Sequence, residues 1–245
     1  MRIFGLIGKT LSHSFSPGFF DEKFTRENFP ECTYKLFPLQ DAKEIHSLIR
    51  ENPEIEGLNV TIPYKKDIMP LLDEISGDAR EIGAVNTIRI HRGGGKIRLE
   101  GFNTDATGFL HACTALRNRP AALVLGTGGS AAAVKYILER FQIPFLSVSR
   151  SPSGSEIGYD DLDEKAIRKH RLIINTTPLG MYPDIDHFPP VPYQHLKSEH
   201  HLFDLIYNPA ETLFLKKGEA AGARTQNGFL MLELQAERSW EIWNT

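Results

Sequence analysis

Two lysines, Lys65 and Lys66, follow an apolar, β-branched run that suits a strand. Pro63 cannot continue a sheet ladder because it has no N–H, but it suits the first turn of a helix that reaches about Leu72. Thr61 and Lys65 would then lie in the crevice at a strand's carboxyl end, where open α/β sheets bind ligands. A helix start and a second lysine disfavour the ammonium form, so Lys65 could exchange a proton. Taken alone, Lys65 and Lys66 are explained better as solvated lysines on the surface of a helix than as catalytic groups.

A loop with several hydroxyl side chains follows the first predicted strand, Ile3–Ile7. Ser14 and Ser16 stand directly before Pro17, which could open a helix that runs to about Phe24. Ser16 fits an N-cap, which is the more common outcome of this spacing. Two hydroxyls and the N–H groups of a helix start also make a site for a carboxylate. One serine can serve both roles.

Three further polar side chains have both a structural and a ligand-binding interpretation. Asp105 precedes a helix expected from about residue 107 to 117, where an aspartate is a common N-cap. Asn86 could be a turn amide or a ligand contact. Gln235 lies on the margin of the apolar stripe of a predicted C-terminal helix, Gly228–Trp243, and could be a core-edge amide or a ligand contact.

A nucleotide-binding unit is indicated in the middle of the chain. Ala121–Leu125 is a fully apolar strand, as expected in a parallel sheet that is covered on both faces. It runs into Gly126–Ala131, a predicted helix through Arg140 and a second strand, Phe145–Val148. This βαβ unit carries the dinucleotide fingerprint, with alanine in the third glycine position. The glycines would let the backbone approach a pyrophosphate at the helix N-terminus.

The residues after the second of these strands indicate which cofactor is bound. NAD sites carry an acid about 20 residues after the glycines, which binds the ribose 2′-hydroxyl. Here that place holds Ser149, Arg150 and Ser151. No carboxylate repels a phosphate, and the arginine offers planar donors for one, so we expect NADP. An exposed loop arginine would explain Arg150 but not the missing acid.

Strands and helices continue to alternate along the C-terminal half, which predicts an α/β fold. We expect strands at Leu172–Asn175 and Leu202–Tyr207, and a helix at Glu211–Ala221. His200 and His201 have no metal-ligand spacing and are expected to be solvated.

The properties of the whole chain exclude several classes of protein. Its 245 residues suit two modest domains better than one core. A net charge of −3 without a basic stripe argues against nucleic acid, and no apolar run approaches a membrane span. The two cysteines show no ligand spacing, so we expect no metal site, no disulfide framework and a reducing, cytoplasmic location.

Several motifs coincide in order and spacing, and together they resemble shikimate dehydrogenase over nearly the whole chain. The motifs are Ser14–Pro17, Asn59–Lys65, Gly83–Thr87, Gly101–Asp105, Gly126–Gly129, Asn175–Met181 and Gln235-Ala236. The combined pattern is highly specific, whereas pairs of these motifs would not separate this family from other two-domain enzymes that use NADP.

The resemblance implies two α/β domains. Residues 1–105 and 225–245 would form the substrate-binding catalytic domain, with a mixed, mostly parallel sheet to which the C-terminal helix returns. Residues 106–224 would form a Rossmann-type NADP-binding domain. The implied activity is the reversible, NADPH-dependent reduction of 3-dehydroshikimate to shikimate in chorismate and aromatic amino acid biosynthesis. We expect a small-molecule substrate and a monomer or homodimer, without nucleic-acid or membrane partners.

The resemblance also assigns roles to residues. Lys65 and Asp105 would be the catalytic pair, and which of them transfers the proton stays open. The substrate would be bound by Ser14, Ser16, Thr61, Lys65, Asn86, Asp105, Tyr207 and Gln235. The cofactor would be bound by Gly126, Thr127, Gly128, Gly129, Ser130, Ser149, Arg150, Ser151, Thr176, Gly228 and Met231.

The chain departs from the family pattern in the cofactor domain, which is short after Ser151. Ser149, Arg150 and Ser151 stand where the family often has Asn-Arg-Thr, and the arginine that supports NADP is kept. Two alternatives stay open. A quinate/shikimate dehydrogenase of broader specificity that can use NAD would favour an acid near Ser149. A non-catalytic NADP-binding regulatory module would need neither Lys65 nor Asp105.

Overall fold

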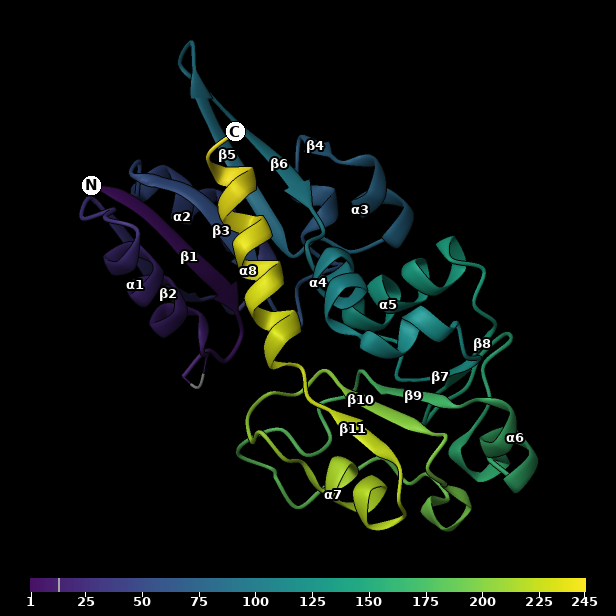
Figure 1. The fold of residues 1–245 in the computed structure, drawn as a ribbon. Helices are drawn as coiled ribbons and strands as arrows, with labels where there is room; N and C mark the ends of the chain where they lie inside the picture. Colours follow the sequence, from purple (N-terminus) through teal and green to yellow (C-terminus); the bar gives the residue numbers. More distant parts are fainter. Residues whose placement is uncertain (13) are drawn as a thin grey trace. The chain divides into compact units, whose positions relative to one another are not determined.

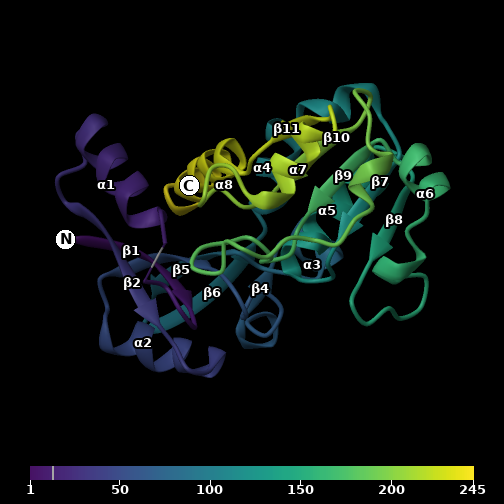
Figure 2. The same cartoon turned by 90° about the horizontal axis from the view of Figure 1, so that it is seen from below.

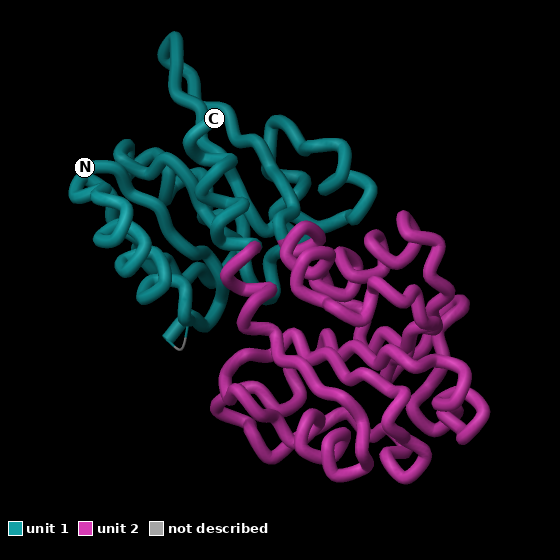
Figure 3. Tube along the Cα trace, viewed as in Figure 1, with its two compact units in different colours: residues 1–104, 235–245 teal, residues 105–234 magenta. Residues whose placement is uncertain are grey.

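The computed structural model describes residues 1–12 and 14–245, and helices and strands alternate along the chain (Figure 1). The chain forms two compact units, one of residues 1–104 and 235–245 and the other of residues 105–234 (Figure 3). Each unit is built around a sheet of its own. No helix in the described part of the chain is both long enough and apolar enough to cross a membrane.

The first unit contains a six-stranded mixed sheet with the order β2-β1-β3-β5-β6-β4. β5 pairs antiparallel with both of its neighbours, and the other neighbouring strands are parallel. The β5–β6 hairpin turns at Gly94 and Gly95, whose φ angles of 58° and 73° favour glycine. The strands are β1 (Arg2–Gly8), β2 (Cys32–Pro38), β3 (Ile55–Val60), β4 (Glu74–Ile75), β5 (Thr87–Gly93) and β6 (Lys96–Phe102).

Helices cover both faces of this sheet (Figure 2). Side chains alternate along β1, so that Ile3 and Ile7 join the core beneath α2 while Phe4 and Leu6 join the core beneath α1 and α8. The C-terminal helix contributes Trp240 to that second core, as expected from the sequence. The helices are α1 (Ser16–Arg26), α2 (Ile45–Glu51), α3 (Gly77–Ile82) and α8 (Phe229–Trp243), with short 3-10 turns η1 (Ala42–Glu44) and η2 (Met69–Leu71). Only the part of α8 from residue 235 onward belongs to this unit.

The second unit contains a five-stranded, fully parallel sheet with the order β11-β10-β9-β7-β8. The chain runs outward from β7 to β8 and then returns across β7 to β9, which creates a topological switch point between β7 and β9. The strands are β7 (Ala122–Leu125), β8 (Phe145–Val148), β9 (Leu172–Asn175), β10 (His201–Asp204) and β11 (Arg224–Gln226). With the mixed first sheet, this confirms the predicted fold class.

The helices of the second unit agree with the predicted βαβ pattern. The one that follows the glycine loop is α5 (Gly129–Arg140), and its buried side chains pack toward the sheet. The others are α4 (Asp105–Ala112), α6 (Glu164–Lys169) and α7 (Leu213–Ala220), with 3-10 turns η3 (Thr114–Asn118), η4 (Tyr159–Asp161) and η5 (Tyr193–His195). The three-residue strand β11 was not predicted, because it is short and polar.

The helix expected after Pro63 does not form. Successive turns occupy this segment and end in η2. The carbonyl of Lys65 accepts the N–H of Val85 at 2.7 Å, so it is not available for a regular helical ladder. Pro70 has no N–H and would clash with the carbonyl four residues earlier, which prevents a longer helix. Lys65 therefore does not lie at the N-terminus of an α-helix, and the positive helix dipole that was expected to disfavour its ammonium form is absent there.

His200 is buried, which contradicts the expectation that it is solvated. Its Nδ1 accepts the N–H of Lys197 at 2.9 Å. Nε2 then carries the ring proton and donates to the carbonyl of Ile167 at 3.1 Å. The ring therefore links α6 to the segment before β10 through backbone groups, and no pattern of side chains in the sequence reveals such partners.

Candidate active site

The loops that follow β1 and β3 lie against each other in the first unit. The N–H of Thr61 donates to the carbonyl of Ile7 at 2.9 Å. A Cβ atom at Gly8 would lie 2.6 Å from the methyl group of Thr61, so only glycine allows this approach. The contact places Thr61 at the carboxyl end of two parallel strands, where the sequence predicts a ligand site.

Ser14 and Ser16 also follow β1, at the start of α1. The hydroxyl of Ser14 accepts the N–H of Ser16 at 3.3 Å, and Ser16 is the first residue of the helix. The helix begins one residue earlier than the sequence suggested, so the N-cap is Phe15, which makes no side-chain cap bond, and Ser16 is not the cap. The hydroxyl of Ser14, one residue before the cap, accepts the first helical N–H instead. Both hydroxyls stand beside the N–H groups of a helix start, which suits an anion.

Lys65 is brought to the start of β5 by its backbone. Its carbonyl bond to Val85 adjoins Asn86, whose own carbonyl accepts the N–H of Val60 at 2.8 Å. Thr61 and Lys65 from the loop after β3 therefore lie in the same part of the unit as Asn86. The lysine and the threonine are half-buried, while Asn86 is almost completely buried.

The amide of Asn86 is held by two segments that are distant in the sequence. Its Oδ1 accepts the N–H of Thr104 at 2.7 Å, and its Nδ2 donates to the hydroxyl of Thr104 at 3.0 Å. The same Nδ2 lies 3.4 Å from Oε1 of Gln235 on α8. Two of the predicted substrate-binding side chains, Asn86 and Gln235, are thus in contact within this unit.

Asp105 directly follows Thr104 and is the first residue of α4. Its side chain is 6% exposed. The predicted helix from about residue 107 to 117 therefore begins earlier and is shorter, and Asp105 lies inside its first turn rather than at the N-cap. A carboxylate in a first helical turn is stabilised by the helix dipole.

The glycine loop of the second unit lies where three strands end. The N–H of Gly126 donates to the carbonyl of Val148 at the end of β8, at 2.9 Å. Its φ angle is 107°, and a Cβ atom there would lie 2.7 Å from the hydroxyl of Thr176, which follows β9. That hydroxyl donates to the carbonyl of Leu125 at 2.6 Å. Thr176 therefore stands at the switch point beside the loop.

The loop leads into the N-terminus of α5. Gly128 has an extended backbone and occupies the N-cap position, and Gly129 and Ser130 lie in the first turn. A Cβ atom at Gly128 would meet no protein atom within 4 Å. A helix start with glycine at its cap, beside a switch point, offers backbone N–H groups to a phosphate, so the residues present fit a dinucleotide.

Ser149, Arg150 and Ser151 follow β8 in a tight loop. The hydroxyl of Ser149 accepts the N–H of Ser151 at 3.2 Å, and Arg150 is exposed. The chain turns back at once, because the N–H of Ser149 donates to the carbonyl of Ile157 at 2.9 Å. Residues 149–151 therefore carry one guanidinium and no carboxylate where the ribose 2′-position is expected, and the acid of the same loop, Glu156, accepts the N–H of Ser153 at 3.2 Å.

The segment that leads into α8 lies against the residues that follow β10. The N–H of Gly228 donates to the carbonyl of Ile206 at 3.0 Å, and a Cβ atom at Gly228 would overlap the backbone of Leu205. Tyr207 follows directly and is half-buried, while Met231 is buried at the start of α8. This glycine thus allows the start of α8 to approach the loop after β10.

Asp204 at the end of β10 was not predicted as a notable residue. Its carboxylate is fully buried and accepts the Thr212 hydroxyl at 2.6 Å and the Asn175 amide at 3.0 Å. Burial nevertheless raises the pKa of Asp204 to about 7. The sequence feature that could have identified this residue is an aspartate at the end of an otherwise apolar run, Leu202-Phe203-Asp204.

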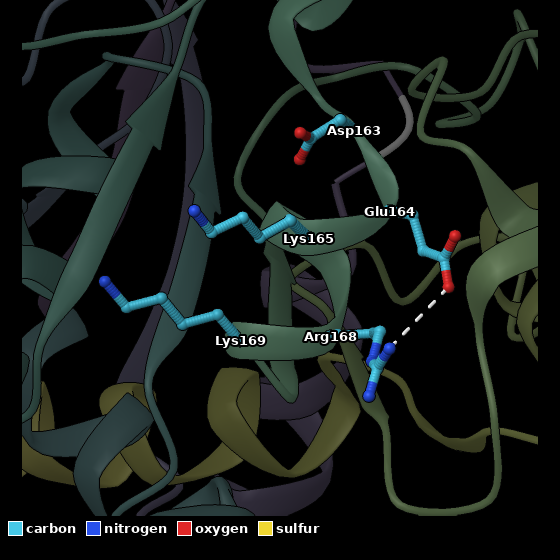
Figure 4. A pocket seen from close by; sticks show the side chains of 5 residues that line it. All are labelled: Asp163, Glu164, Lys165, Arg168 and Lys169. Carbon is cyan, nitrogen blue, oxygen red and sulfur yellow. Dashed lines mark ion pairs between the residues drawn. The ribbon is translucent and has the colours of Figure 1, made fainter.

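A hollow of about 610 Å³ on the second unit contains none of the predicted residues. It is lined by Asp163 and four residues of α6. Figure 4 shows Lys165 and Lys169 extending in the same direction, while Glu164 pairs with Arg168 at 3.9 Å. All of its lining comes from one six-residue helix and its cap, so we assign it no function. Among the described residues, no group of three or more His, Cys, Asp or Glu side chains could hold a metal ion.

The chain is similar to known proteins along its whole length. A family model described as the shikimate dehydrogenase substrate binding domain matches residues 6–88. The NADP(+) shikimate dehydrogenase of Clostridium beijerinckii is 40% identical over 258 residues, which cover 99% of this chain and 92% of that protein.

Solved structures agree with this relationship. Shikimate 5-dehydrogenase from Thermus thermophilus, in complex with NADP(H) and shikimate, matches with a TM-score of 0.84 at 30% identity and covers 99% of this chain and 93% of that one. Quinate dehydrogenase from Corynebacterium glutamicum, in complex with NAD, matches with a TM-score of 0.83 at 26% identity and the same coverage. On the sequence identity over its full length, this chain belongs to the shikimate dehydrogenase family.

Proposed function

We propose that this chain is an NADP-dependent shikimate dehydrogenase that reversibly reduces 3-dehydroshikimate to shikimate. The observation that carries the proposal is the grouping of Thr61, Lys65, Asn86 and Gln235 around the loops after β3 and before β5. These hydroxyl, amide and ammonium groups suit a ring that bears several hydroxyls and a carboxylate.

The substrate carboxylate is assigned to the start of α1. Ser14 and Ser16 supply hydroxyls there, beside helix N–H groups that favour negative charge. The ring hydroxyls are assigned to Thr61, Asn86 and Gln235, with Asp105 and Tyr207 as further contacts. A pocket that hydrogen-bonds hydroxyls discriminates strongly against analogues that lack them, because its buried polar groups would then stay unpaired.

The cofactor is assigned to the second unit. Gly126, Thr127 and Gly128 in the loop would hold the pyrophosphate together with Gly129 and Ser130 in the first turn of α5, and Thr176 lies beside the loop. Ser149, Arg150 and Ser151 would hold the 2′-phosphate, and Gly228 and Met231 would border the nicotinamide. NADPH supplies the hydride when it is bound.

The chemistry assigned to this chain's own side chains is proton transfer. The carbonyl oxygen of the substrate gains negative charge as it is reduced and needs a proton at that moment. Lys65 and Asp105 are the two groups we assign to that oxygen. One donates the proton and the other orients the oxygen, and in the oxidation of shikimate the group that donated the proton accepts it back.

The test is an assay of the purified chain with 3-dehydroshikimate and NADPH, followed by the loss of nicotinamide absorbance. We expect turnover with NADPH that far exceeds turnover with NADH. A chain that binds NADPH but turns over neither 3-dehydroshikimate nor shikimate would instead be the regulatory module. Cytoplasmic location and assembly as a monomer or homodimer remain part of the proposal.

A second candidate is a quinate/shikimate dehydrogenase of broader specificity. The fold similarity to a quinate dehydrogenase in complex with NAD supports considering it. The absence of a carboxylate among residues 149–151 argues for the first candidate. Quinate oxidation with NAD+ at a rate comparable to shikimate oxidation with NADP+ would favour the broader enzyme.

A further inference from the structure

The hydroxyl of Ser239 on α8 is a meeting point for four segments of the first unit. It lies 2.9 Å from Nδ2 of Asn59, 2.8 Å from the hydroxyl of Thr87 and 3.2 Å from that of Thr104. It also lies 2.9 Å from the carbonyl of Gln235, one helical turn earlier. Ser239 is fully buried, as are Thr87 and Thr104. We name these five residues the Ser239 network.

The orientation of Asn59 in this network is determined by a tyrosine. The hydroxyl of Tyr34 donates to Oδ1 of Asn59 at 2.8 Å, because a carbonyl oxygen can only accept. The NH₂ group of Asn59 therefore faces Ser239 and Thr87, at 2.9 Å and 3.2 Å. Each of these buried donors would be costly to leave without an acceptor.

The orientation of the two proposed substrate-binding amides follows from the same network. Thr104 donates its N–H to Oδ1 of Asn86, so the NH₂ group of Asn86 faces Gln235. Oε1 of Gln235 accepts there, and it also lies 3.4 Å from the hydroxyl of Thr104. The carbonyl end of the Gln235 amide therefore faces Asn86 and Thr104, and its NH₂ end points away from them.

We propose that Ser239 and Thr87 are positioning residues that hold the amides of Asn86 and Gln235 in the orientation that binds the ring hydroxyls of the substrate. This inference rests on the proposed function. Both side chains have no exposed surface, so they act through their neighbours and not by contact with substrate. A site held in this way keeps its geometry because the supporting hydrogen bonds lock the rotamers of its members.

The first test is Ser239→Ala, measured in the direction of shikimate oxidation. We expect the KM for shikimate to rise about tenfold and kcat to fall by less, because Thr104, which contacts both amides, loses the Ser239 hydroxyl at 3.2 Å. The KM for NADP+ should stay unchanged, since the proposed cofactor residues belong to the other unit.

The matched control is Trp243→Phe. The indole N–H of Trp243 donates to the carbonyl of Ile88 at 3.0 Å, so this variant also removes one buried hydrogen bond between α8 and β5. It leaves Asn59, Thr87 and Gln235 intact. Because the smaller ring also loses packing against Phe4, we expect a fall in melting temperature at least as large as that of Ser239→Ala, with the shikimate KM unchanged. A purely structural role for Ser239 predicts that the two variants behave alike.

A second pair of variants separates shape from hydrogen bonding at Thr87. Thr87→Val keeps the volume and removes the hydroxyl, whereas Thr87→Ser keeps the hydroxyl and removes a methyl group. We expect Thr87→Val to raise the shikimate KM several-fold and Thr87→Ser to restore it. This pair also serves if Ser239→Ala does not fold.

The outcomes distinguish this inference from the proposed function. Absence of shikimate turnover by the unmodified chain refutes the function and the inference together. Turnover by the unmodified chain with an unchanged shikimate KM in folded Ser239→Ala and in Thr87→Val refutes the inference alone. A selective rise of the shikimate KM in both variants supports it.

Discussion

The two units build their proposed binding sites from different chemical groups. In the first unit the site is made of side chains, and uncharged polar groups such as Asn86 and Thr104 are buried and bonded to one another. In the second unit the site is made mainly of backbone, and glycines at 126 and 228 allow chain segments to touch. The side-chain site should therefore be sensitive to the loss of a polar atom, and the backbone site to the gain of a carbon atom.

The largest expected effect is at Lys65, the proposed proton-transferring side chain of the first unit. We expect Lys65→Ala to reduce kcat by about 10³-fold, because general acid–base catalysis contributes on the order of 10²–10⁴-fold. NADPH binding, measured by fluorescence titration, should persist. Lys66→Ala is the matched control, and its kcat and NADPH binding should be close to those of the unmodified chain. Near-normal turnover in Lys65→Ala would overturn the assignment of the catalytic pair.

Gly126→Ala tests the backbone character of the cofactor site. The added carbon would meet the hydroxyl of Thr176, and a φ angle of 107° is strained for alanine. We expect the free energy of unfolding to fall by about 3 kcal/mol even without cofactor. Chemical denaturation measures this loss. Gly128→Ala, which meets nothing within 4 Å, should keep its stability and weaken only NADPH binding. Equal stability in both variants would contradict this account.

Asp204 tests what happens when a charge is buried where its neighbours are neutral. Its pKa of about 7 in the folded chain lies above the ordinary value of 3.8, so the folded state favours the protonated carboxyl. The contribution of Asp204 to stability is therefore largest below about pH 3.8 and is lost as pH rises to about 7. We expect roughly 2 kcal/mol of this loss between about pH 5.5 and pH 8.

Asp204→Asn is the comparison variant, because it has the same shape and cannot ionise. Its free energy of unfolding should lack this loss over the same range of pH. Urea denaturation at a series of pH values measures both chains. Parallel curves for the two chains would mean that the Thr212 and Asn175 donors keep the carboxylate ionised after all.

The smallest expected effect concerns the one charged side chain assigned to the cofactor. Arg150→Ala should weaken NADPH binding about tenfold, the loss of a charge-assisted contact to the 2′-phosphate, and should leave NADH binding nearly unchanged. Dissociation constants for both nucleotides give the answer directly. An equal loss for both would show that Arg150 contacts a group that the two cofactors share.

The second unit was well predicted because its signals are local. Ala121–Leu125 is apolar because both faces of its sheet are covered, and the glycines directly after it have one common structural use. The structure places β7, α5 and β8 at almost the predicted residues. The prediction was wrong where partners come from elsewhere in the chain, as with the buried ring of His200.

The first unit shows the opposite balance. The prediction of a helix after Pro63 was wrong. The N–H of Val85 donates to the carbonyl of Lys65, and only the folded structure reveals this hydrogen bond. A smaller and purely local difference occurs at α1, where Ser16 is the first helical residue rather than the N-cap and the hydroxyl of Ser14 accepts its N–H. The motifs around Asn86 and Gln235 were recognised, but their contact through Thr104 and the role of Ser239 follow only from the structure.

The sequence by itself determined the α/β fold, the nucleotide-binding unit and the family, because these depend on periodicity, on glycines at fixed spacing and on motifs that keep their order. Only the tertiary structure decided which polar side chains are bonded to which. Hydrogen bonds across 18 to 180 positions, such as those from Asn86 to Thr104 and from Asn59 to Ser239, have no local signature. The role of each polar side chain depends on how buried it is and on which way its donors and acceptors point, and both are properties of the folded chain only.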